Sequence, residues 1–258
     1  EWLFHKTLKT EEIISLRYFF IKVFLNGNDL GIYAVEENFD ERLIENNDRR
    51  DGIIIRFDEQ WDWIESHQFR RFKEKREHRS GYGSFYSLPI STFNRNKVNI
   101  DSIKIKQFNN AHYLMDGFRS GNITTTQAFD IKKLAKYFAL VDLLGGLHGS
   151  IVQNIRLYYN PITNKLEPVG FDASPGTNIH RLSFMIEKNN FDPANTIYFS
   201  NLFKDINFFE LYIKELYNYS NISYLDKLFE SFNDEIIVVE HLINYEWPSI
   251  KLDKAIFF

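Results

Sequence analysis

The chain has 258 residues, of which 44% are hydrophobic, 17% aromatic and 26% charged, with a formal net charge of −4 and no cysteine. This length allows a sizeable core in one large domain or two lobes, and the high aromatic content argues against disorder over most of the chain. The weak negative charge gives no indication of nucleic-acid binding. The lack of cysteine excludes disulfides, thiolate metal ligands and cysteine nucleophiles.

The two ends of the sequence are typical of a segment cut from a longer protein. It opens on Glu1 rather than on Met and closes on the apolar residues 255–258, so we expect the true N-terminus to lie upstream. No signal peptide is visible, and no apolar run reaches the roughly 18 residues that a membrane-spanning helix needs. We therefore expect no membrane span in this segment, while its compartment and oligomeric state stay open.

The first 60 residues are rich in strand signals. Residues 16–25 are aromatic and β-branched, which predicts a buried strand. The Asn-Gly pair at 26–27 predicts a tight hairpin, with 30–36 as the returning strand. A short helix is expected over 39–46 and a third strand directly after Gly52. Together these elements predict a small β-rich lobe.

The middle of the chain changes character. Residues 58–80 are dense in charges of both signs, which indicates a solvated helix or loop rather than a basic docking surface. A helix is expected over 107–120. A second helix, capped by Asp130, is predicted by apolar residues at helical spacing. Those residues are Leu134, Phe138, Val141 and Leu144.

A polar loop and a hairpin follow this helix. Residues 155–159 alternate as a strand, 160–164 form a turn, and 166–171 return as a second strand. A hairpin brings the chain back to its starting edge, so Asn154 and Asp172 should lie side by side. A carboxylate and an amide oxygen are ligands suited to Mg²⁺, which takes its remaining ligands from water and phosphates. The sequence therefore predicts a metal site between these two side chains.

Beyond this hairpin the pattern is mostly helical, over 199–218 and 222–243, so the expected fold class is α+β. The order of helix, loop ending in Asn, hairpin and Asp also matches the catalytic half of a protein kinase. This match is topological, because neither a Gly-rich phosphate loop nor the usual kinase signatures occur.

Three segments carry a resemblance to a known family. LNGNDLGIYAVEENFD, KLAKYFALVDLLGG and NIRLYYNPITNKLEPVGFD resemble parts of the CotH family, atypical kinases named after spore-coat protein H. The resemblance covers residues 16–57 and 128–176. It implies a two-lobed protein-kinase-like fold, with a β-rich N-terminal lobe over about 1–105 and a helical C-terminal lobe over about 106–258 that carries the site. It also implies binding of ATP with Mg²⁺ or Mn²⁺, transfer of phosphate to Ser or Thr of a protein, and a bacterial envelope, secreted or spore-coat setting.

The resemblance also assigns roles by position. Asp172 looks like the family's metal-binding Asp, and Asn154 looks like its loop Asn. Arg56 falls where the family has a strand Lys that contacts phosphates; Arg keeps the charge but is not equivalent to Lys. Either Glu36 or Glu37 matches the family's Glu after the tyrosine, and the sequence does not choose between them.

Two departures from the family pattern leave the activity open. Gly149 stands where the family has an Asp that positions the acceptor hydroxyl, and the neighbouring His148 is the titratable group available as a base. The segment FDAS keeps only Asp172 of the two family Asp residues. A weak kinase, a nucleotide-binding pseudokinase, a different transferase and a structural envelope or coat-associated protein without a nucleotide site all remain as alternatives.

Each candidate residue also has a structural interpretation. Asp172 fits a turn cap, Asn154 a loop hydrogen bond, and His148 compensation of a helix end. Arg56 needs an anionic partner, which would be a phosphate or one of Glu36 and Glu37. The pair at 180–181 is expected on the surface, and Asp142 is expected to be structural. The remaining histidines show no metal-ligand spacing and are expected to be non-functional; they are His5, His67, His78, His112 and His241.

Overall fold

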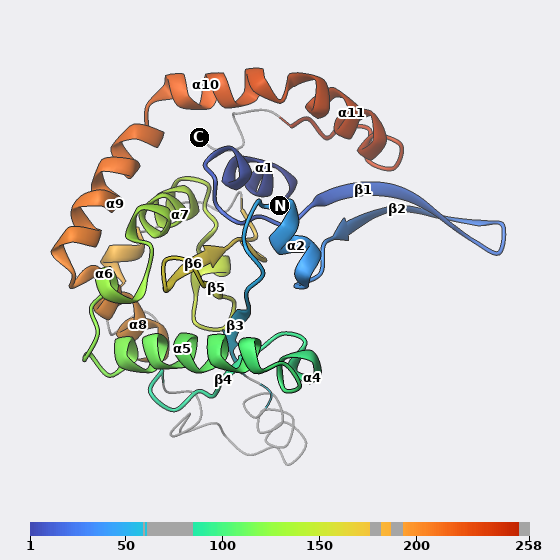
Figure 1. Cartoon of the computed structure of the whole chain (residues 1–258). Helices are drawn as coiled ribbons and strands as arrows, with labels where there is room; N and C mark the ends of the chain where they lie inside the picture. The colour runs from blue at the N-terminus through green and yellow to red at the C-terminus, as the bar shows by residue number, and fades with distance from the viewer. Residues whose placement is uncertain (59, 61–84, 176–181, 187–192, 253–258) are drawn as a thin grey trace, which may run out of the picture.

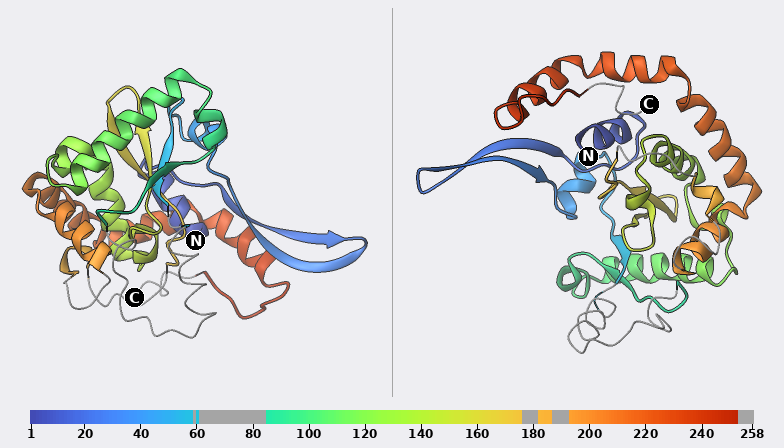
Figure 2. Two further views of the ribbon diagram at one scale, coloured as in Figure 1. Left: turned by 90° about the horizontal axis from the view of Figure 1, so that it is seen from below. Right: turned by 180° about the vertical axis from the view of Figure 1, so that it is seen from behind.

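The computed structural model describes residues 1–58, 60, 85–175, 182–186 and 193–252. It confirms the α+β class: helices enclose a small antiparallel sheet, and a second, two-stranded sheet projects from the body (Figures 1 and 2). The charged segment lies outside the described residues from 61 onward, and so does the pair 180–181. Within the described residues, no helix combines the length and apolar character needed to cross a membrane.

The strands form two separate sheets. Their bounds are β1 Tyr18–Leu25, β2 Asn28–Glu36, β3 Ile54–Phe57, β4 Ile90–Thr92, β5 Arg156–Asn160 and β6 Lys165–Val169. The first sheet contains β1 and β2, and the second has the order β4-β3-β5-β6 with every pair antiparallel.

The helices occupy most of the remaining described chain. Their bounds are α1 Trp2–Thr10, α2 Glu41–Asn46, α4 Arg95–Val98, α5 Ser102–Arg119, α6 Thr125–Ala128, α7 Ile131–Leu143, α8 Pro193–Phe203, α9 Ile206–Tyr219, α10 Ile222–Ser231 and α11 Asn233–Ile243, with short 3-10 turns η1 Leu147–Ser150 and η2 Ser183–Met185. The helix predicted over 199–218 is two helices, because Asp205 caps a new helix by accepting the Asn207 N–H. The one predicted over 222–243 is also divided, at Phe232.

The first hairpin forms as the sequence predicts, but the prediction that its first strand is buried is wrong, because no residue of β1 is buried and Phe24 is 60% exposed. Asn26 and Gly27 have φ values of 52° and 83°, the left-handed pair that a type I′ turn requires. The hairpin reaches out beyond the helices, and the residues directly after α11 contact it midway along its strands (Figure 1). There the Glu246 carboxylate accepts the Ile32 N–H at 2.7 Å, and the Lys22 ammonium lies 3.5 Å from the ring centre of Tyr245.

The third strand does not join this hairpin. β3 pairs instead with β5, so the first 60 residues do not form one sheet. The alternation of β3 explains its place: Ile55 and Phe57 enter the main core on one face, whereas Ile54 enters a second core on the other. The boundary expected near residue 105 falls within α5, and the four-stranded sheet joins strands from both sides of it.

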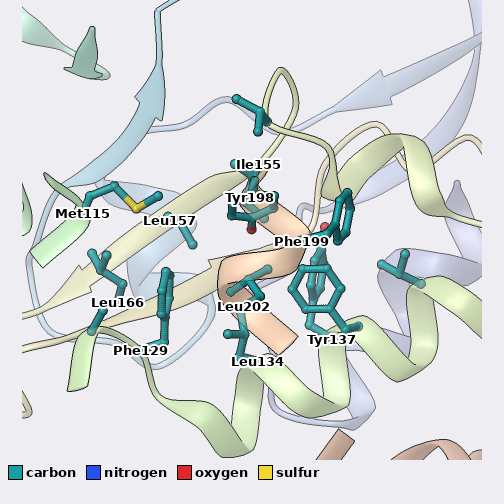
Figure 3. Packing of buried hydrophobic residues seen from close by; sticks show 14 of the residues in the cluster. Met115, Phe129, Leu134, Tyr137, Ile155, Leu157, Leu166, Tyr198, Phe199 and Leu202 are labelled. Atoms are coloured by element: carbon teal, nitrogen blue, oxygen red, sulfur yellow. The ribbon is translucent and has the colours of Figure 1, made fainter. Parts of the chain in front are cut away.

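The main core surrounds α7. Asp130 caps this helix by accepting the Lys133 N–H, as the sequence predicts. Its side chains Leu134 and Tyr137 pack among residues from β5, β6 and α8 (Figure 3). Because α7 ends directly before η1 and β5, the best-packed part of the molecule supports the predicted site.

Candidate functional site

Three of the predicted residues meet at one end of the β5–β6 hairpin. Arg156 pairs with Val169 in this hairpin, so Asn154 and Asp172 lie just outside the last pair, at the same edge. The 3-10 turn η1 places His148 beside them. The structure therefore brings together Asn154, Asp172 and His148, as the sequence predicts.

The contacts among these three side chains are direct. Asn154 Nδ2 donates to Asp172 Oδ2 at 3.3 Å and to the His148 carbonyl oxygen at 3.1 Å. His148 Nδ1 lies 2.9 Å from the Asp172 carbonyl oxygen and 3.4 Å from Oδ2. The contact with the carbonyl oxygen uses a proton on Nδ1, whereas the Asn154 Nδ2 donor, 3.0 Å from Nδ1 and 3.3 Å from Nε2, uses a ring lone pair, so the roles of the two ring nitrogens depend on the tautomer.

The backbone at Asp172 is in an uncommon conformation. Asp172 and Ser174 have φ values of 43° and 48°, in the left-handed region that non-glycine residues seldom adopt. His148 holds the Asp172 carbonyl, and the Glu1 carboxylate accepts the Ser174 N–H. Such strain persists only where surrounding contacts hold it, and it is often found at functional sites.

Gly149 fits because no side chain could occupy its position. A Cβ there would lie 2.5 Å from the Phe171 carbonyl oxygen and 2.9 Å from the Ala173 Cα. The 3-10 turn is thus packed directly against residues 171–173. The aspartate that the family has at this point is excluded by packing in this backbone arrangement.

The donor set suits a hard divalent cation that keeps part of its water. The side chains of His148 and Asp172 are 51% and 44% exposed, so a ligand can reach them. A cation shared by Asp172 and Asn154 would be bound by the amide oxygen, which requires a half-turn of the Asn154 amide. Across the described residues no three His, Asp or Glu side chains are arranged to hold a metal alone, so phosphate and water would supply the other ligands.

The two glutamates after Tyr33 lie in different surroundings. Burial, followed by the negative charges of Glu1 and Asp172, raises the pKa of Glu36 above its ordinary range. Glu37 instead binds the Arg17 guanidinium at 2.7 Å and accepts from Asn46 Nδ2 at 2.7 Å. Glu36 is therefore close enough to Asp172 for their charges to interact, whereas Glu37 is bound to Arg17 and Asn46.

His5, which the sequence analysis expects to be non-functional, lies buried beside Glu1 and Glu36. It is 2% exposed, and its Nδ1 accepts the Leu16 N–H at 3.2 Å. Its Nε2 lies 3.5 Å from the Glu1 carboxylate and 4.0 Å from that of Glu36. Burial lowers the pKa of His5 to about 3, so the ring is neutral and its Nε2–H faces these carboxylates without forming an ion pair. The i, i+4 spacing of Glu1 and His5 could have predicted their contact. That prediction would have required α1 to be identified as a helix from the sequence.

Arg56 lies apart from both glutamates that were its expected partners. Its guanidinium carbon is 4.8 Å from the ring centre of Phe93, and its buried Nε has no hydrogen-bond acceptor among the described residues. Directly opposite on β5 is Arg156, which sequence reasoning also missed. The pairing of β3 with β5 could not be predicted from the sequence around either strand.

Asp142 has a buried structural position, as expected from its place within a helix. It is 3% exposed and accepts from the Ser183 N–H at 3.0 Å, the Ser183 hydroxyl at 2.6 Å and the Tyr212 hydroxyl at 2.6 Å. Burial raises the pKa of Asp142 to about 6. These bonds tie residues 182–186 to α7 and α9.

Comparison with known proteins identifies the family. The model of the CotH kinase protein family matches residues 4–253, a range that includes every candidate site residue except Glu1. A search of curated proteins gives no match. Because the match spans nearly the whole chain, this protein belongs to the CotH kinase protein family.

Proposed function

We propose that this chain is a two-lobed protein-kinase-like domain that binds ATP with Mg²⁺ or Mn²⁺ and transfers phosphate to Ser or Thr of a protein. The observation that carries the proposal is the contact of Asn154 with Asp172, beside an accessible imidazole, at the end of the β5–β6 hairpin. Kinase-like sites use one carboxylate and one amide to hold metal and phosphates together. We also propose that the N-terminal lobe spans about residues 1–105 and the C-terminal lobe about residues 106–258.

Each residue then has a defined task. Asp172 and Asn154 would hold the cation, and the Glu36 carboxylate would add negative charge beside them. The cation, when bound, neutralises charge on the transferred phosphoryl group. Arg56 would donate to phosphate oxygens, and the neutral imidazole of His148 would accept the proton of the substrate hydroxyl.

Asp172→Asn tests the proposal. The substitution removes the charged ligand with little change in size, so we expect Mg²⁺-dependent ATP affinity to fall at least tenfold in calorimetry. Asp48→Asn is the matched control, because Asp48 is exposed and has a φ of 54°, which Asn also tolerates. Equal Mg·ATP affinity in wild type and Asp172→Asn would refute the metal assignment.

A second candidate, a nucleotide-binding pseudokinase, is favoured by specific packing. Gly149 excludes a carboxylate from the base position, and Ala173, next to Asp172, is 0% exposed. Phosphate transfer from labelled ATP to a mixed protein substrate separates the two candidates. Transfer that is lost in His148→Gln identifies the kinase, and ATP binding without transfer identifies the pseudokinase.

The remaining alternative is a structural envelope or coat-associated protein without a nucleotide site. A ligand at 100 times its dissociation constant stabilises a protein by about 2.7 kcal/mol. A melting temperature that does not change with Mg·ATP would support this alternative against both nucleotide-binding candidates.

A further inference from the structure

The projecting β1–β2 hairpin has an uncovered apolar face. Phe19 pairs with Val35 and Ile21 with Tyr33, and residues that pair in this way share one face of the sheet. Phe19, Ile21 and Tyr33 are 40–49% exposed. The register places all three charged side chains of β1 and β2 on the opposite face. An exposed apolar face of this kind is typical of an interaction surface.

The opposite face of the hairpin is already occupied. The Lys22 ammonium lies 3.5 Å from the ring centre of Tyr245 and binds the Asp29 carboxylate at 2.9 Å. The Tyr245 hydroxyl donates to Asp29 Oδ2 at 3.1 Å. Lys22 and Asp29, the charged residues nearest the tip, therefore neutralise each other. The hairpin is thus held against the residues that follow α11, and its outer half has no net charge.

The tip of the hairpin is apolar as well. Phe24, Leu25 and Leu30, which flank the turn at 26–27, are 60%, 58% and 43% exposed. Because a Phe or Tyr side chain can bury about 150–250 Å², the six exposed apolar residues of the hairpin offer roughly 500 Å² of surface per copy. A two-stranded hairpin is only marginally stable without a covering partner.

A cavity of about 550 Å³ lies at the base of the same hairpin, between α1, the start of β1 and α11. Apolar side chains form most of its wall, among them Trp2, Tyr18, Phe20, Val239 and Leu242. Phe19 also lines it, so the apolar surface continues from the uncovered face of the hairpin into the cavity.

The length of the hairpin relates its tip to this cavity. The eight residues of β1, at about 3.4 Å each, extend for about 27 Å. When two such hairpins pack antiparallel through their apolar faces, the tip of each lies beside the base of the other. The cavity is lined by residues 16–20 at that base. Because the hairpin projects beyond the helices, the bodies of the two copies lie at opposite ends of the paired hairpins (Figure 2).

We propose that two copies of this chain form a twofold dimer by exchanging their β1–β2 hairpins, with each tip in the cavity at the base of the other hairpin. A twofold contact brings the same surface of both copies together, so any charge on it would face its own kind. The apolar face carries none. The two sets of hairpin side chains bury about 1,000 Å² and the cavity walls add to this, which reaches the smaller specific interfaces of about 1,200 Å². An area of this size predicts a reversible dimer.

Sedimentation equilibrium tests the proposal. We expect wild type to show a monomer–dimer equilibrium that depends on concentration. Ile21→Lys places like charges across the twofold contact, so it should weaken the dimer at least tenfold. Ile103→Lys, the same change at an exposed isoleucine of α5, is the matched control and should dimerise like wild type. Asp172→Asn should also dimerise like wild type, because the interface does not depend on the proposed function.

A second variant separates dimerisation from folding. Val239→Phe partly fills the cavity and leaves the hairpin unchanged. It should weaken the dimer without lowering the melting temperature of the dilute monomer. Ile21→Lys changes an exposed residue, so its far-UV circular dichroism should match that of wild type.

Disulfide formation between copies tests where the tip lies. The chain contains no cysteine, so introduced thiols report on their own positions. A mixture of a Leu25→Cys chain with a Val239→Cys chain should form a mixed disulfide under mild oxidation, since a disulfide needs Cα atoms within about 7 Å. Peptide mass spectrometry identifies this link. A mixture of Ile103→Cys with Val239→Cys chains is the control and should not form one.

The possible results are distinct. A wild type that stays monomeric at every concentration would overturn the exchange and leave the apolar face to a different partner. A dimer that Ile21→Lys leaves unchanged would also overturn it. A dimer that is sensitive to Ile21→Lys but forms no disulfide between positions 25 and 239 would overturn the placement of the tip in the cavity.

Discussion

Two buried residues ionise outside their ordinary ranges, with opposite consequences for stability. His5 has a pKa near 3 in the folded protein, whereas an unfolded chain restores a value near 6.5. Below about pH 6.5 the unfolded state therefore binds more protons, and stability falls as pH decreases. Asp142 has a pKa near 6 against an ordinary value of 3.8, so its contribution rises as pH falls through 6.

Replacement of His5 by Gln should reduce the loss of stability in acid. A pKa difference of this size corresponds to about 3 kcal/mol between pH 6.5 and pH 4. We expect the urea-unfolding free energy of His5→Gln to fall less over this range than that of wild type. Asp142 is present in both proteins, so the difference between the two curves isolates His5.

His241→Gln is the control for this comparison, because His241 is exposed at the end of α11. Its pH profile should follow that of wild type. Parallel profiles for wild type and His5→Gln would show that the His5 pKa is not depressed by folding.

At the scale of elements, the packing of η1 against residues 171–173 controls the site. Gly149→Ala would place a methyl group 2.5 Å from the Phe171 carbonyl oxygen. Overpacking of this kind costs about 1–3 kcal/mol. We expect Gly149→Ala to lower the free energy of unfolding by that amount and to weaken Mg·ATP binding, because Asp172 is held by the same turn. Chemical denaturation and calorimetry measure the two effects.

Gly121→Ala provides the comparison for this substitution. Gly121 has a φ of 78° and nothing within 4 Å of the added Cβ, so its variant reports backbone strain without crowding. It should lose stability without any change in nucleotide affinity. If Gly149→Ala were as stable and as active as wild type, η1 would not be what fixes Asp172.

At the scale of the whole molecule, one core joins both proposed lobes. Ile55 and Phe57 of β3 pack in the same cluster as Leu134 of α7, which is 0% exposed. We expect a single unfolding transition, with far-UV circular dichroism and tryptophan fluorescence changing together. Leu134→Ala should shift the whole transition and lower stability by about 2–5 kcal/mol. Two separate transitions would instead show that the lobes fold independently.

Structural features could be predicted from the sequence where the residues in contact are close together along the chain. The Asn26–Gly27 turn and the Asp130 cap were predictable because their contacts lie within a few residues. The partner of β3 was not, because its apolar alternation fits any sheet with a buried face. The divisions of the long C-terminal helices were also missed, since apolar spacing continues through Asp205 and Phe232.

The sequence by itself determined the meeting of Asn154 and Asp172, because a tight hairpin returns the chain to its starting edge whatever surrounds it. Only the tertiary structure decided that Arg156 faces Arg56 and that His5 approaches Glu36. These pairs join segments distant in the chain. Their contacts follow from which strand edges and helix faces bury the most apolar surface together, a property of the assembled core that no local pattern contains.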